Sequence, residues 1–199
     1  MNLPNKLTVS RFALTVVFLW ALFWPWTVPF RYTFALFFCL AGVTDFLDGR
    51  IARSRNLITN FGILMDPLAD KIMTCSAFIA FVESTRLHSD APVKVGAWMV
   101  VIIVARELAI TGLRLLAASK NIVLAAERYG KHKTISQIVT IIALLVTDAC
   151  QEWPDGLKNL FVSWAPSFAA AMLWLTVVLT AMSGIIYLWR NRALYLEDV

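Results

Sequence analysis

The sequence predicts an all-α integral membrane protein with six transmembrane helices. Apolar residues make up 59% of the chain, and the mean hydropathy is +0.70, well above the usual range for soluble domains. Two stretches without a charged residue, 12–30 and 159–189, approach or exceed the roughly 20 residues that a helix needs to cross a bilayer, and two shorter ones lie between them. Six such helices would use up most of the 199 residues, which leaves little chain for a soluble domain.

We therefore expect a single membrane domain over residues 1–199. Charged residues are allowed at the helix ends and on faces that point into the bundle. With that allowance, the expected spans are 8–28, 32–52, 60–82, 94–117, 133–149 and 167–189.

Each span has its own justification in the sequence. The first contains the uncharged run 12–30, which is too long for the apolar part of a signal peptide and is followed by no small-residue cleavage site. The second starts with the uncharged run 32–44, and an acidic block joins it to the third. In the fourth, Arg106, Glu107 and Arg114 share an arc of about 100° on a helical wheel, so they should face inward. The fifth and sixth contain the uncharged runs 134–147 and 159–189.

The distribution of basic residues predicts the orientation in the membrane. The N-terminus, the two loops after the second and fourth spans, and the C-terminus fall on one side. That side, counted with the inward-facing helix ends, holds all but four of the 18 basic residues, the exceptions being Arg31, Arg86, Lys94 and Lys158. Because positively charged segments stay inside, we expect this side to face the cytoplasm.

Four aspartates lie together near that cytoplasmic side. Asp45 and Asp48 end the second span, and Asp66 and Asp70 begin the third. Ionised carboxylates near a bilayer are costly and persist mainly where they pair, bind metal or do chemistry. Side chains three or four residues apart share a helix face, so two adjacent helices would bring all four together. Two divalent cations, Mg²⁺ or Mn²⁺, would balance the four charges, and two-metal sites suit displacement at phosphorus.

These aspartates belong to the pattern D-x-x-D-G-x-x-A-R-x8-G-x3-D-x3-D, which matches the signature of the CDP-alcohol phosphatidyltransferase family without a departure. The resemblance implies that Asp45, Asp48 and Asp66 ligate metal, and that Asp70 is the general base and a further metal ligand. It also implies a homodimer. The residues that resemble the family's cytidine-diphosphate pocket are Asp45, Gly49, Ala52, Arg53, Thr59 and Gly62. Lys71, beside the base, either pairs with one of the carboxylates or extends toward the interface.

The fourth and fifth spans indicate which alcohol attacks. Several cations with one acid and a few hydroxyl and amide groups would line the predicted active-site cavity at the cytoplasmic side. This composition favours an anionic, hydroxylated acceptor such as a polyol phosphate over choline or ethanolamine. The candidate acceptor-phosphate residues are Arg106, Arg114, Lys131, Lys133, Thr134 and Gln137. The alternative is that these cations bind lipid headgroups and fix the topology, which we favour for Lys120 and Arg128.

Three segments resemble one branch of the family, the bacterial phosphatidylglycerophosphate synthases. They are Pro4-Asn5-x-Leu7-Thr8-x-x-Arg11, Ala105-Arg106-Glu107 and Gly130-Lys131-x-Lys133-Thr134-x-x-Gln137. The resemblance implies that glycerol 3-phosphate attacks CDP-diacylglycerol, giving phosphatidylglycerophosphate and CMP, at a bacterial cytoplasmic (inner) membrane. Inositol phosphate remains an alternative acceptor.

Two other classes of membrane protein use intramembrane carboxylates. Prenyltransferases carry two acidic motifs far apart in sequence, whereas Asp48 and Asp66 are close together here. Divalent-cation transporters need polar residues across the whole bilayer, whereas the outer halves of these spans are apolar. The three cysteines, at 39, 75 and 150, have no CxxC spacing and are expected to be buried apolar residues without a disulfide or metal.

Overall fold

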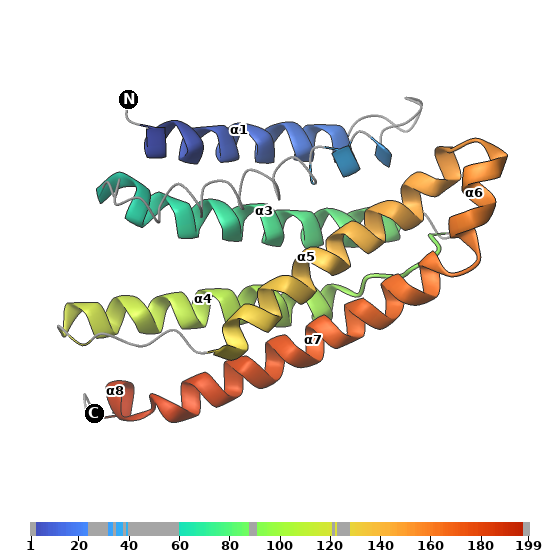
Figure 1. Ribbon diagram of the computed structural model, residues 1–199. Helices are drawn as coiled ribbons and strands as arrows, with labels where there is room; N and C mark the ends of the chain where they lie inside the picture. Colours follow the sequence, from blue (N-terminus) through green and yellow to red (C-terminus); the bar gives the residue numbers. More distant parts are fainter. Residues whose placement is uncertain are drawn as a thin grey trace.

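The computed structural model describes residues 3–23, 32–33, 35–37, 39, 60–87, 91–120, 122 and 128–196. These residues form helices and connecting turns and contain no strand, so the all-α class is confirmed for them (Figure 1). The helices are α1 (Leu3–Phe23), α3 (Asn60–Leu87), α4 (Ala97–Ser119), α5 (Arg128–Ala149), the 3-10 turn η1 (Cys150–Glu152), α6 (Asp155–Val162), α7 (Ala165–Arg190) and α8 (Ala193–Leu196).

Five of these helices, α1, α3, α4, α5 and α7, overlap predicted spans, but their ends differ from the predicted bounds. α5 begins at Arg128 rather than 133, and α3 continues to Leu87 rather than 82. Hydropathy marks only the apolar part of a helix, whereas backbone hydrogen bonding continues through polar residues at its ends. α4 starts later than predicted, at Ala97, because the carbonyl of Gly96 accepts its first helical bond, from the backbone N–H of Met99 at 3.0 Å. Most of the predicted second span lies outside the described residues.

Two helical stretches among the described residues, His132–Glu152 and Ala165–Arg190, are long and apolar enough to cross a membrane. α4 has a comparable length, but Arg106, Glu107 and Arg114 interrupt its apolar sequence. Charged residues of this kind are tolerated in a span when they face the interior of the bundle and pair there.

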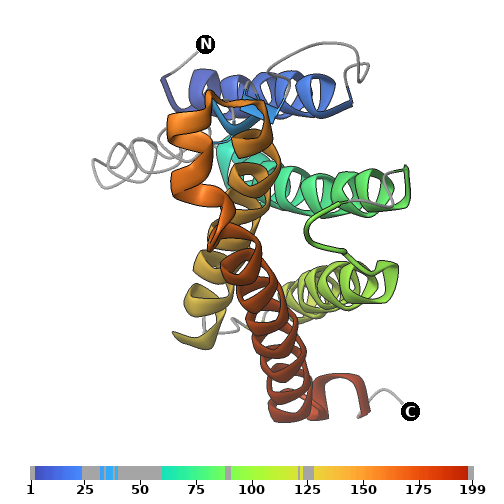
Figure 2. The same ribbon diagram turned by 90° about the vertical axis from the view of Figure 1, so that its right-hand side faces the viewer.

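The helices are arranged in two groups. α1, α3 and α4 stack in a row, and α5 and α7 run obliquely across one side of that row (Figures 1 and 2). One end of the bundle collects the start of α1, the start of α3, the end of α4, and the end of α7 with α8. α6 lies at the opposite end. α5 starts in the half of the bundle away from α6, so residues far apart in the sequence, from α3, α4, α5 and α7, meet in that half.

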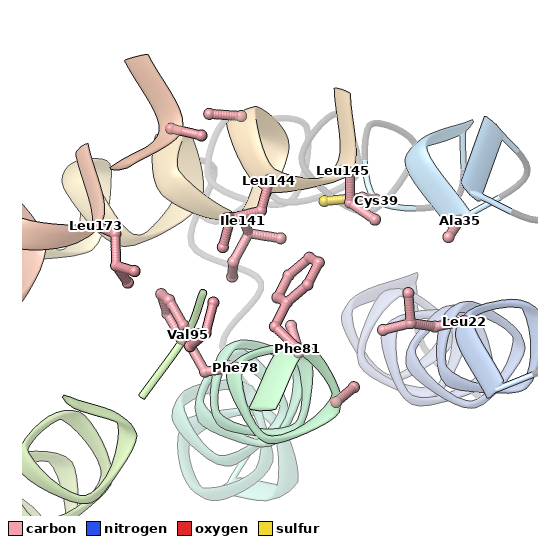
Figure 3. Packing of buried hydrophobic residues seen from close by; sticks show 14 of the residues in the cluster. Leu22, Ala35, Cys39, Phe78, Phe81, Val95, Ile141, Leu144, Leu145 and Leu173 are labelled. Carbon is pink, nitrogen blue, oxygen red and sulfur yellow. The ribbon is translucent and has the colours of Figure 1, made fainter. Parts of the chain in front are cut away.

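The apolar core fills the space between the two groups. Phe78 and Phe81 of α3 point toward Ile141 and Leu145 of α5, with Leu173 of α7 beside them (Figure 3). Phe78 and Leu145 are fully buried. Small residues such as Ala77 are also fully buried and let the helices approach closely.

A polar contact fixes the end of the bundle near α6. The Glu152 carboxylate accepts hydrogen bonds from the backbone N–H groups of Tyr32 and Thr33 at 3.1 and 3.0 Å, and from the Thr33 hydroxyl at 2.9 Å. The Trp153 indole N–H donates to the same hydroxyl at 3.0 Å. Glu152 therefore supplies the acceptors for the backbone N–H groups of Tyr32 and Thr33 and ties this segment to the end of α5.

Candidate functional site

The site is centred on a carboxylate in the middle of α4. Glu107 is 6% exposed and lies one residue after Arg106, between the apolar stretches at either end of that helix. An isolated buried carboxylate would be strongly destabilising, so it needs a compensating charge. The prediction that the charged residues of this span face inward is confirmed for Glu107, which is buried, and Arg106 is half-buried. The prediction is wrong for Arg114, which is exposed, two helical turns after Glu107 and close to the end of α4.

The compensating charge comes mainly from α5. The ammonium group of Lys133, which is 3% exposed, donates a hydrogen bond to Glu107 Oε1. Arg106 Nη1 lies 3.4 Å from the same oxygen. Two cations therefore share one carboxylate oxygen, and the pair between Glu107 and Lys133 joins α4 to α5.

Lys71 of α3 extends this network to a third helix. Its ammonium group donates to the Thr111 hydroxyl, which in turn donates to the Glu107 carbonyl oxygen at 2.7 Å. Lys71 was expected either to pair with a motif carboxylate or to extend toward the membrane interface, and this contact with Thr111 of α4 is neither. Since Lys71 directly follows Asp70 in the sequence, the contact brings the end of the acidic block next to the charged face of α4.

α7 contributes residues that the sequence analysis did not assign. Its Gly184 packs against Arg106, and the guanidinium group of Arg114 lies 5.9 Å from the centre of the Tyr187 ring. Arg114 Nε also lies 3.5 Å from the Tyr187 hydroxyl. Gly184 and Tyr187 are three residues apart and share a helix face. In the sequence, these residues are a glycine and a tyrosine three positions apart in a long apolar run. That pattern is equally typical of residues that only pack helices together, so it did not identify them as site residues.

The structure describes the side chains of three of the four predicted acceptor residues on α5. Lys133 and Gln137 are buried, and Thr134 is half-buried on the same side of the helix. Gln137 Nε2 has no hydrogen-bond partner among the described residues, although its residue is only 2% exposed. The backbone of Lys131 lies in the first turn of α5, and its side chain is outside the described part.

The described side chains give this site a positive charge. Lys71, Arg106 and Lys133 lie around one acid, Glu107, and Arg114 lies further along α4 beside Tyr187. The net charge of these five groups is +3, from four cations and one carboxylate. A cluster of this composition, built from the three helices α3, α4 and α5, can hold an anionic group such as a phosphate through charge-assisted hydrogen bonds.

The predicted metal and nucleotide residues fall mainly outside the described part. Asp45, Asp48, Gly49, Ala52, Arg53 and Thr59 are not described, and Gly62, Asp66 and Asp70 are described only as backbone within α3. Asp66 and Asp70 are one helical turn apart near the start of α3, as two carboxylates that share a site must be. The residues whose side chains are described contain no group of three or more acidic, cysteine or histidine residues that could hold a metal. Cys39, Cys75 and Cys150, all within the described residues, are free thiols, and Cys39 and Cys150 are buried as expected.

Comparison with known proteins gives a consistent result over nearly the whole chain. The family model for CDP-alcohol phosphatidyltransferase matches residues 1–182. A CDP-diacylglycerol–glycerol-3-phosphate 3-phosphatidyltransferase of Bacillus subtilis (strain 168) is 38% identical over 201 residues, covering 96% of this chain and 95% of that protein. Relatives with the same name from Rickettsia felis and Shigella flexneri serotype 5b are 31% and 32% identical. The first covers 94% of this chain and 93% of its own length, and the second 99% and 98%.

Proposed function

Because this chain belongs to the CDP-alcohol phosphatidyltransferase family, we propose that it transfers the phosphatidyl group of CDP-diacylglycerol to glycerol 3-phosphate. The products are phosphatidylglycerophosphate and CMP, so the protein is an enzyme of phospholipid biosynthesis. The names of the relatives support this choice of substrates.

The observation that carries the choice of acceptor is the network around Glu107. Lys133 and Arg106 hold the carboxylate from two sides, and Lys71 joins the same network through Thr111. The cations outnumber the acid, so the network favours an anion and disfavours a cationic alcohol. Lys71 directly follows Asp70, the last aspartate of the motif. When these cations hold the phosphate of glycerol 3-phosphate, the hydroxyl groups of its glycerol part therefore lie close to the acidic block.

The acidic block performs the chemical step in this proposal. Asp70 takes the proton of the attacking hydroxyl group, whose oxygen forms a bond to the β-phosphorus of CDP-diacylglycerol while the bond to CMP breaks. Asp45, Asp48, Asp66 and Asp70 hold two divalent ions, Mg²⁺ or Mn²⁺, which stabilise charge on the diphosphate oxygens when bound. Four carboxylates and no softer ligand form a donor set that suits these hard cations.

The nucleotide lies against the rest of the motif. Gly49, Ala52 and Gly62 leave room for the cytidine diphosphate, beside Asp45. Arg53 offers its guanidinium fork to phosphate oxygens, and Thr59 donates its hydroxyl group. The acceptor phosphate lies against Arg106, Arg114, Lys131, Lys133, Thr134 and Gln137.

We further propose that the chain crosses a bacterial cytoplasmic membrane six times, with the site facing the cytoplasm, and that it forms a homodimer. The two helices that are apolar and long enough to span, together with the inward-facing Arg106 and Glu107 of α4, support the membrane assignment. The start of α1, the end of α4 and the end of α7, which carry Lys6, Lys120 and Arg190, lie at one end of the bundle, and the positive-inside rule supports a cytoplasmic orientation of that end.

A CMP-release assay on the purified protein tests the reaction class. With CDP-diacylglycerol and Mg²⁺ present, CMP should appear only when an alcohol acceptor is added. CMP release without an acceptor would indicate a hydrolase instead. Cation uptake by reconstituted vesicles, with no CMP formed, would indicate a transporter.

A further inference from the structure

α7 packs two buried residues, Gly184 and Tyr187, against the arginines of α4. Thr180, Gly184 and Tyr187 are spaced by four and three residues, so they share one face of the helix. The Thr180 hydroxyl is fully buried and has no hydrogen-bond partner among the described residues. The other two contact the two arginines of α4. α7 therefore forms a wall of the site, although its sequence carries no charge before Arg190.

Gly184 leaves the space that the stem of Arg106 occupies. A Cβ atom at position 184 would lie 2.9 Å from Arg106 Cγ and 3.6 Å from Arg106 Cβ. The first distance is shorter than real Cβ contacts allow, and the atom concerned is near the start of the arginine side chain. A flexible tip can move aside, but Cγ moves only if the whole side chain adopts another rotamer. Any residue larger than glycine here would redirect Arg106.

The direction of Arg106 matters because of what its guanidinium group reaches. Nη1 lies 3.4 Å from Glu107 Oε1, and the buried Nε has no partner within the described part of the chain. A buried donor without an acceptor is costly, and an oxygen of a bound ligand would satisfy it. Tyr187 acts on Arg114 in a parallel way, through its ring and its hydroxyl group.

We propose that α7 is the positioning helix of the acceptor site, in which Gly184 directs Arg106 and Tyr187 directs Arg114 toward the acceptor phosphate. The inference rests on the proposed function, because it assigns the two arginines to the acceptor. Gly184 and Tyr187 touch no reacting atom and act through the arginines. A role in helix packing alone would instead change stability and affect both substrates equally.

The test compares Gly184→Ala with Gly112→Ala in the full-length protein. Gly112 is on α4, two residues before Arg114, and a Cβ atom there would meet nothing within 4 Å. Steady-state kinetics are measured with each substrate varied separately. Gly184→Ala should raise the KM for glycerol 3-phosphate about tenfold, the loss of one charge-assisted bond, and leave the KM for CDP-diacylglycerol within about twofold. Gly112→Ala should match the wild type.

A double-mutant cycle with Arg106→Gln identifies the route of the effect. If Gly184 acts through Arg106, Gly184→Ala should cause no further change in a protein that already carries Arg106→Gln. Effects that multiply in the double variant, or a Gly184→Ala protein that behaves like Gly112→Ala, would overturn the proposal.

Tyr187→Phe keeps the test decisive if Gly184→Ala does not fold. It removes one hydroxyl group and should raise the acceptor KM severalfold, whereas Tyr195→Phe, whose hydroxyl donates to the Leu188 carbonyl at 3.2 Å, should have no effect. An unchanged acceptor KM in Tyr187→Phe would contradict the role of α7. If the wild type uses inositol phosphate and not glycerol 3-phosphate, the named acceptor is wrong, and the same variants assayed with inositol phosphate still decide the role of α7.

Discussion

The carboxylate of Glu107 on α4 and the ammonium group of Lys133 on α5 form an ion pair in which both side chains are buried. The pair has two consequences. It fixes the distance between the two helices that carry the predicted acceptor residues. It also means that Lys133 is already paired before any phosphate arrives, so its contribution to acceptor binding depends on Glu107.

Glu107→Gln should destabilise the protein by roughly 3 kcal/mol, because it leaves the Lys133 ammonium group buried without its counter-charge. The free energy of unfolding is measured by denaturant titration in detergent micelles. Adding Lys133→Met should restore much of the stability, since the most deeply buried cation that Glu107 balances is then removed. It should not restore acceptor affinity, because the cation is gone. Wild-type stability of Glu107→Gln would show that the pair contributes little.

Asp70→Asn should retain CDP-diacylglycerol binding and lose about 10²- to 10⁴-fold in turnover. The amide has a similar shape to the carboxylate but does not accept the proton of the attacking hydroxyl group. CMP formation and nucleotide affinity are measured in parallel. Asp155→Asn, on α6 at the other end of the bundle, serves as the control and should match the wild type. Undiminished turnover in Asp70→Asn would exclude Asp70 as the base.

Removal of divalent cations with EDTA should abolish activity, and Mg²⁺ or Mn²⁺ should restore it. Asp45→Ala and Asp66→Ala should lose nucleotide binding as well as rate, because these carboxylates hold the ions that contact the diphosphate. Glu83→Ala, an exposed carboxylate further along α3, should change neither property. Full activity in EDTA would contradict the two-metal assignment.

Glu152→Ala should lower the free energy of unfolding by about 1–3 kcal/mol, because the N–H groups of Tyr32 and Thr33 lose their acceptor. Gln151→Ala changes the exposed neighbouring residue and should have little effect. The KM of either substrate should stay near the wild-type value in both variants, since this contact lies at the end of the bundle opposite the site. Equal stabilities of the two variants would show that the contact has no energetic role.

The sequence predicted the helices well where an apolar run defined them. α7 follows from one long uncharged run, and its predicted and observed ends differ by two residues at the start (167 against Ala165) and one at the end (189 against Arg190). The ends of α3 and α5 were wrong by more, because both helices continue into polar residues that hydropathy does not mark. The six-span topology remains a prediction.

The residues of the site could be predicted where a charged side chain interrupts an otherwise apolar helix. The shared faces predicted that Arg106 and Glu107 of α4 and Lys133 of α5 would point toward one site, and these residues come together. The ion pair between Glu107 and Lys133 was not predicted, and Arg114, expected on the same inward face, is exposed and contacts Tyr187. The contact between Lys71 and Thr111 was not predictable, because it depends on how α3 packs against α4. Gly184 and Tyr187 were missed for the same kind of reason, since their roles depend on what lies opposite them rather than on their own chemistry. The roles of the motif aspartates remain predictions.

The most direct test of the account is the identity of the lipid product when acceptors compete. The purified protein is supplied with CDP-diacylglycerol, Mg²⁺, and equal concentrations of glycerol 3-phosphate, inositol phosphate and choline, and the lipid products are identified by mass spectrometry. The account predicts phosphatidylglycerophosphate as the dominant lipid product, with CMP formed in equal amount. A dominant product from choline, or from inositol phosphate, would contradict the assignment of the charged site to glycerol 3-phosphate.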